Sequence, residues 1–158
     1  MAVSGLRDTV SGRGDCCAGY SRHRGRVGVD EVKLYHFTSP HHVEGCTSKG
    51  ISLGCIPTRI LPPQFVFGFQ WLTANPEYKQ SWNEGSSLPY DRTTYRLTVE
   101  VPEEYEHNVV QWNKIGIFLT PLYNTLSATA DHINWYLYRG KIPPEWITLV
   151  EAKMQTLV

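Results

Sequence analysis

The 158-residue sequence predicts an α+β domain in which short helices pack around a curved, split β-sheet or sandwich. Segments typical of strands alternate with short helical segments, in the approximate order β–α–β–α–β–α–β–β. Ten prolines and an aromatic content of 12% favour strands joined by defined turns over a helical bundle.

Composition bears on domain organisation and on partners. The 15 basic and 15 acidic side chains balance, so net charge does not indicate a polyanionic partner. There is no run of about 18 apolar residues and no secretory signal pattern, so we expect no membrane segment and a cytoplasmic protein. Residues 1–30 combine glycines and arginines with few large apolar side chains, which predicts a disordered basic arm before a single domain at 31–158.

The first predicted strand covers residues 32–38 and carries a histidine. Period-two alternation places His36 on one face with Leu34 and Thr38. A histidine in this apolar strand has two interpretations. It is either a buried ring with a local hydrogen bond or a ligand contact at the end of the strand.

A helix is predicted directly after this strand. Ser39 fits the N-cap position and Pro40 the first helical position, and Gly50 fits the end of a helix over 40–49. Residues 51–57 are predicted to be irregular or briefly extended. Prolines at 57, 62 and 63 then predict a loop that contains Arg59.

The histidines and cysteines in this region raise the question of a zinc site. Their spacing matches no standard pair-of-pairs pattern, so we predict no metal and free thiols; the residues are His41, His42, Cys46 and Cys55.

The strongest predicted strand covers residues 65–73. Alternation places Trp71 on a face of aromatic side chains, and Gly68 indicates a bulge or a close backbone approach. Trp71 is either an ordinary core aromatic or a stacking wall for a flat ligand. Asn75 and Pro76 predict a second helix start, with a short helix reaching residues 80–82 and a loop at 83–92.

Later segments complete the predicted sheet. Residues 93–101 alternate as a half-solvated strand, and residues 102–106 suit a helical turn. Residues 111–119 favour no element. A helix over 122–132, a strand over 135–138, a turn at 139–141 and a final strand through Ala152 follow.

The order of these motifs resembles the ADP-ribosyltransferase superfamily. The resemblance rests on Tyr35-His36-Phe37-Thr38-Ser39 before a helix, then Lys49-Gly50-Ile51, then Trp71-Leu72-Thr73 before Pro76. It is to small bacterial members such as the rifampin-modifying enzymes, whose first strand carries a Tyr/Leu-His-Gly-Thr signature. The strand at 95–101 and the block at 135–147 are also similar to DNA-modifying toxins and RNA 2′-phosphotransferases. Together these motifs span about residues 32–152.

Membership implies NAD as a co-substrate and assigns roles to residues. His36 would hydrogen-bond the ribose 2′-hydroxyl, and Trp71 would stack on nicotinamide where a tyrosine is usual. The other NAD contacts would come from Tyr35, Phe37, Thr38, Ser39, Thr73 and Arg59, with Phe37 and Thr38 using backbone groups. Arg92 and Arg96 are further candidates for the pyrophosphate, although solvated arginines are the ordinary case. The third catalytic residue would be an acid, with Glu145 first and Glu103, Glu104 or Asp131 as alternatives.

These residue types suit cleavage of the N-glycosidic bond of NAD. That reaction passes through an oxocarbenium-like state, which rigid holding of nicotinamide and a nearby carboxylate would favour. The expected function is transfer of ADP-ribose to a protein, nucleic acid or small molecule. The alternatives are an inactive nucleotide- or partner-binding module and an RNA 2′-phosphotransferase. All of this requires His36 and Trp71 to line one nucleotide-sized crevice.

Overall fold

The computed structural model describes residues 33–59, 62–83, 88–115, 124, 127–128 and 130–154. All of them belong to Glu31–Val158, the second of the two compact units into which the chain divides. The predicted basic arm at residues 1–30 lies outside the described residues. So do residues 122, 123, 125, 126 and 129 of the predicted helix at 122–132 and residues 84–87 of the predicted loop.

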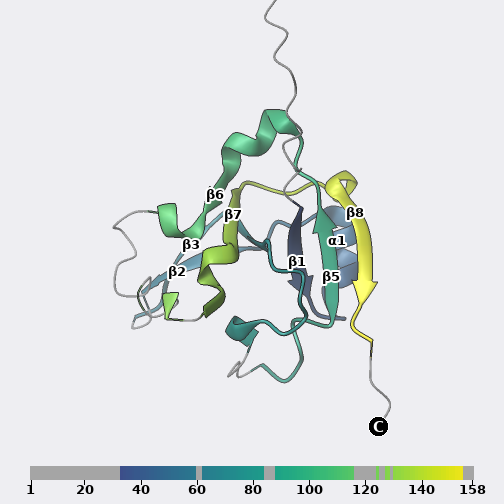
Figure 1. Ribbon diagram of the computed structural model, residues 1–158, viewed down its shortest axis with the longest axis horizontal. Helices are drawn as coiled ribbons and strands as arrows, with labels where there is room; N and C mark the ends of the chain where they lie inside the picture. The colour runs from purple at the N-terminus through teal and green to yellow at the C-terminus, as the bar shows by residue number, and fades with distance from the viewer. Residues whose placement is uncertain are drawn as a thin grey trace, which may run out of the picture. The chain divides into compact units, whose positions relative to one another are not determined.

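The described chain has an α+β fold built on a six-stranded antiparallel sheet in the order β6-β7-β4-β1-β5-β8 (Figure 1). A separate antiparallel pair joins β2 to β3. In chain order the strands are β1 Leu34–Thr38, β2 Cys55–Arg59, β3 Gln64–Phe67, β4 Phe69–Thr73, β5 Tyr95–Val99, β6 Val109–Gln111, β7 Trp135–Arg139 and β8 Ile147–Ala152.

The large sheet is divided between β1 and β4. β1 registers with β5 along all five of its residues, and β4 does the same with β7. Between β1 and β4, by contrast, the register consists of one pair, Tyr35 opposite Thr73. The two halves of the sheet therefore meet at one end of β1 and part toward Thr38, where backbone groups on the β4 side stay outside the ladder.

Helical segments in the described chain are short, and none is long and apolar enough to cross a bilayer. The α-helix α1 covers Val43–Lys49, and 3-10 helices cover Ser81–Asn83, Glu103–Asn108, Trp112–Lys114, Ala130–Asn134 and Pro144–Trp146. α1 begins three residues later than predicted, because residues 40–42 form turns in which the Ser39 carbonyl accepts the His42 and Val43 amides. Gly50 ends the helix with φ 83°, as predicted.

The predicted strand at 65–73 is two strands in different sheets. The chain breaks at Gly68, whose φ is 85°, and the glycine amide donates to the Gly54 carbonyl at 3.2 Å. The predicted loop around Arg59 is also wrong, because β2 runs to Arg59. Pro57 is tolerated there because β2 belongs to a two-stranded sheet, in which one side of each strand needs no ladder donor.

The helix predicted after Asn75 is absent. Instead the Asn75 side chain accepts the Glu77 amide at 3.0 Å, which closes an Asx turn. The buried Gln80 side chain donates to the Asn75 carbonyl at 3.4 Å and holds the turn. Helical geometry is limited to Ser81–Asn83.

The predictions for the second half of the chain are largely confirmed. Strands β5, β7 and β8 lie within or close to the predicted segments, and the helical turn predicted at 102–106 extends from Glu103 to Asn108. Gly140, with φ 116°, occupies the predicted turn at 139–141.

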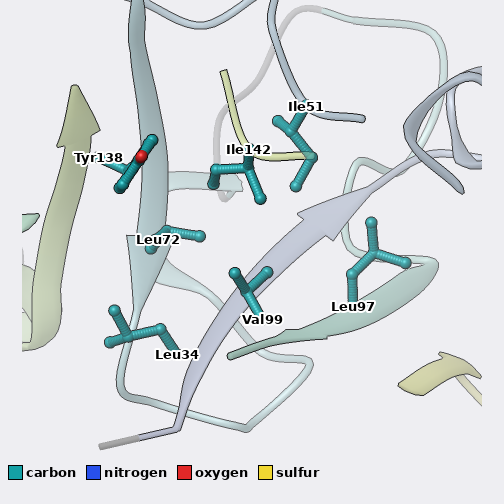
Figure 2. Close-up of a cluster of buried hydrophobic side chains, with 7 residues drawn as sticks. All are labelled: Leu34, Ile51, Leu72, Leu97, Val99, Tyr138 and Ile142. Carbon is teal, nitrogen blue, oxygen red and sulfur yellow. The ribbon is translucent and has the colours of Figure 1, made fainter. Parts of the chain in front are cut away.

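Each face of the sheet carries a hydrophobic core. On the face that includes Leu34 and Leu72, Val43 and Cys46 of α1 pack against a cluster shown in Figure 2, formed by Leu34, Ile51, Leu72, Leu97, Val99, Tyr138 and Ile142. The second cluster is aromatic and gathers Ile56, Trp112, Trp135 and Leu137, with Trp71 and Trp82 packed against it. Alternation along β7 separates the clusters, since Tyr138 and Leu137 point to opposite faces.

Candidate functional site

A cavity of about 910 Å³ lies where β1 and β4 diverge. Exposed residues such as Leu53 and Phe65 line its rim, so it opens to solvent. Seven of the nine predicted site residues line it: Tyr35, His36, Phe37, Thr38, Ser39, Trp71 and Thr73. Arg59 and Glu145 do not.

The His36 imidazole bridges the two diverging strands. Its Nδ1 lies 2.9 Å from the Trp71 carbonyl oxygen. A carbonyl can only accept, so Nδ1 carries the proton, and Nε2 of the neutral ring is left as an acceptor. Burial lowers the pKa of His36 below its ordinary value of 6.5, and the bond to Trp71 only partly opposes this shift. The ring is therefore neutral at pH 7, and Nε2 has no hydrogen-bond partner among the described residues.

The Trp71 indole packs within the aromatic cluster. Its Nε1 donates to the Cys55 carbonyl at 2.9 Å, which ties β4 to β2. Its ring centroid lies 5.0 Å from that of Trp112 at an interplanar angle of 39°, and 5.7 Å from that of Trp135 at 88°. One face of the indole thus contacts Trp112, and stacking of Trp71 on nicotinamide stays a prediction.

His36 and Trp71 border the same cavity from opposite faces of the sheet. Tyr35 is opposite Thr73, so alternation places Trp71 on the Tyr35 face and His36 on the other. Both residues belong to the lining of the cavity, but their rings lie on opposite faces of the sheet, which differs from the prediction that the two rings line one crevice; the direct link between them is the bond from the imidazole to the Trp71 backbone.

The proposed acidic residues lie outside the residues that line the cavity. Glu145 is exposed on its 3-10 helix, as are Glu103 and Glu104 on theirs. Asp131 accepts a hydrogen bond from Asn75 at 3.3 Å. Within the described part of the chain, no aspartate or glutamate lines the cavity.

The three candidate arginines have different surroundings. Arg59 is exposed at the end of β2. Arg96 is paired with Glu151 at 2.6 Å, and its guanidinium carbon lies 5.3 Å from the centroid of the Tyr35 ring. Arg92 lines the cavity, with its guanidinium carbon 4.7 Å from the centroid of the Trp82 ring. Of the three, the structure brings only Arg92 to the cavity.

Several lining residues were not predicted, among them Lys49, Gln70, Trp82, Tyr90 and Trp135. Gln70 carried a signal, because a polar side chain in the middle of a strongly apolar strand needs buried partners. It is 1% exposed, accepts the Gly54 amide at 2.8 Å and donates to the Gly140 carbonyl at 2.9 Å. Lys49 ends the helix that follows β1, and Trp82, Tyr90 and Trp135 come from segments whose approach to β1 depends on tertiary contacts.

The cavity also contains sulfur and imidazole groups. Cys46 and Cys55 are free thiols on its wall, alongside His41 and His42. Burial raises the pKa of Cys46, so this thiol is protonated at neutral pH and is a poor nucleophile. Among the described residues, no three or more His, Cys, Asp or Glu side chains gather as a metal site would require.

Comparisons with protein-family models, curated proteins and solved structures found no match for this chain. The resemblance to ADP-ribosyltransferases thus rests on the short motifs around His36 and Trp71.

Proposed function

We propose that the cavity binds NAD and that the protein is an NAD-dependent ADP-ribosyltransferase, which releases nicotinamide. The observation that carries this proposal is the hydrogen bond between His36 Nδ1 and the Trp71 carbonyl at the divergence of β1 and β4. The bond from Nδ1 to the Trp71 carbonyl leaves Nε2 as an acceptor in a cavity of about 910 Å³. A ribose hydroxyl is a donor of the kind that Nε2 would accept.

In the proposed reaction, the role of His36 is to orient the ribose. A neutral imidazole that accepts the hydrogen of a ribose hydroxyl would hold the sugar next to its glycosidic bond. The register of β1 with β4 stops at Tyr35, so the backbone groups that either Phe37 or Thr38 turns toward β4 lie outside that ladder and would be the ones to contact the nicotinamide amide. In this proposal positioning is the main contribution of the described residues, and we expect slow nicotinamide release.

An inactive nucleotide-binding module is the second candidate. It is favoured by one observation: no carboxylate from the described residues lines the cavity to stabilise an oxocarbenium-like state. The phosphotransferase alternative has less support, because Arg92 is the single arginine among the described lining residues.

Incubation with NAD labelled in the nicotinamide ring tests the proposal. We expect release of labelled nicotinamide by the natural protein and none by H36N. The H107N variant is the matched control, because it makes the same change at a histidine that is exposed and does not line the cavity, so its rate should match that of the natural protein. NAD binding without release would support the inactive module, and intact-mass analysis of added proteins and oligonucleotides would identify an acceptor.

A further inference from the structure

Three hydrogen-bond donors without partners lie on the wall of the cavity. Four buried side-chain polar atoms in the described chain have no partner: Ser39 Oγ, Asn83 Oδ1, Arg92 Nε and Trp135 Nε1. Three of these belong to residues that line the cavity, and all three can donate. Ser39 and Trp135 are 1% and 3% exposed, so bulk water does not readily satisfy them. Buried donors without acceptors are costly, which points to a ligand that supplies acceptors.

The segment 88–92 connects these donors. The Tyr90 ring centroid lies 5.0 Å from that of His41, which brings this segment to the turn that begins at Ser39. Two residues later, the Arg92 guanidinium lies over the Trp82 indole. Trp82 packs against the aromatic cluster that contains Trp135. These contacts connect the segments that carry the three donors along the lining of the cavity.

Charge at this wall is positive and has no compensating carboxylate from the described lining residues. The nearest acid in sequence, Asp91, is engaged elsewhere. Its carboxylate accepts the Thr93 amide and hydroxyl at 2.7 Å each and pairs with Lys153 at 3.3 Å. Asp91 is not among the residues that line the cavity. Among the described residues, no carboxylate therefore pairs with Arg92, and its charge is the one that would meet an anion at this wall.

We propose that Ser39, Arg92 and Trp135 form a phosphate subsite, with Arg92 supplying the charge and the other two supplying neutral donors. His36 offers an acceptor, and these three residues offer donors, within the same cavity. A ribose phosphate fits both demands, because its hydroxyl donates and its phosphate oxygens accept. This inference rests on the proposed function, which identifies the ligand as a nucleotide. It adds the residues that would bind the phosphates of that nucleotide.

Calorimetric titration with ADP and with adenosine tests the subsite directly. We expect ADP to bind the natural protein at least about tenfold more tightly than adenosine, since hydrogen bonds to charged groups are the stronger ones. R92Q should weaken ADP binding about 10- to 100-fold, and S39A about tenfold or less, with little change for adenosine. R139Q is the matched control, because this arginine is exposed and outside the cavity, and it should bind ADP as the natural protein does.

Thermal unfolding of each variant separates loss of binding from loss of folding. If R92Q is unfolded, R92K and S39A carry the test, because R92K keeps the charge and removes the Nε donor. Equal affinities for ADP and adenosine, or equal effects of R92Q and R139Q, would overturn the subsite. Nicotinamide release by a protein with those equal affinities would leave the transferase proposal standing without the subsite. Tighter binding of ADP than of adenosine, without release of nicotinamide from NAD, would support the phosphate subsite and contradict the transferase proposal.

Discussion

Nδ1 of His36 lies 2.9 Å from the main-chain oxygen of Trp71, across the point where β1 and β4 part. One bond therefore has two consequences. It joins the two halves of the sheet where the strand ladder stops, and it fixes the tautomer that leaves Nε2 as an acceptor for a ligand. Structural and binding roles of this ring should accordingly be separable by substitution.

Replacement of His36 by asparagine should separate these roles. An asparagine amide can still donate to the Trp71 carbonyl from a position near that of Nδ1, but it has no atom at the position of Nε2. We expect the free energy of unfolding of H36N to lie within about 1 kcal/mol of that of the natural protein. For H36A we expect it to be about 1–3 kcal/mol lower, because this variant leaves the Trp71 carbonyl without its donor. Urea unfolding measures both. Equal stability of H36N and H36A would show that the bond to Trp71 contributes nothing.

Acid should destabilise the fold through the same ring. The pKa of His36 is lowered in the folded state, first by desolvation, so the unfolded chain takes up the proton at higher pH. The contribution of neutral His36 to the free energy of unfolding is fully present above pH 6.5. It is lost as the pH falls below 6.5 toward the folded-state pKa, by at most about 1.4 kcal/mol per pH unit. Urea unfolding between pH 5 and 8 should show this slope, and H36N should show less of it. A slope unchanged in H36N would contradict the assignment to His36.

Replacement of Trp71 by phenylalanine decides between its two interpretations. The indole donates to the Cys55 carbonyl and contacts Trp112, so we expect W71F to lose about 2 kcal/mol of stability. NAD affinity should stay within about threefold, because the ring is engaged in packing. A large loss of affinity at unchanged stability would instead favour the stacking wall for a flat ligand. Chemical unfolding and calorimetry on one preparation give both values.

Gly54 should tolerate no side chain. A Cβ there would lie 2.1 Å from the Phe69 carbonyl oxygen and 2.6 Å from Gln70 Oε1, the acceptor that holds the start of β2. We expect G54A to lose about 3 kcal/mol or more. The matched control is G45A, in α1, where a Cβ meets nothing within 4 Å. It should gain about 0.5–1 kcal/mol because the helix loses a flexible residue. Similar unfolding midpoints for the two variants would contradict this packing.

The sequence predicted best where a local pattern determines the structure. Alternation was found in the segments that form β1 and β5, the strand predicted at 135–138 corresponds to β7, and the first of these predictions put His36 in a strand that borders the cavity. It did not reveal that Gly68 separates two sheets. That break depends on bonds among Gly54, Gly68 and Gly140, which are distant in sequence. The division of these strands between two sheets is therefore only partly encoded in local residues.

Two further errors have similar causes. Asn75 followed by proline is compatible with a helix cap and with an Asx turn, and the buried Gln80 side chain selects the turn. Among the arginines, composition could not distinguish the cavity residue Arg92 from Arg96, which its contact with Glu151 draws to another part of the sheet. Tertiary contacts, which a single sequence does not display, decide both cases.

The central claim is that NAD binds in the cavity with a ribose hydroxyl against His36 Nε2, and calorimetric titration of the natural protein and of H36N with NAD at pH 7.5 tests it most directly. We predict saturable binding of one NAD per chain by the natural protein. For folded H36N we predict affinity at least about tenfold weaker, from loss of the acceptor. The absence of NAD binding by the natural protein, or equal affinities of the two proteins, would contradict the claim.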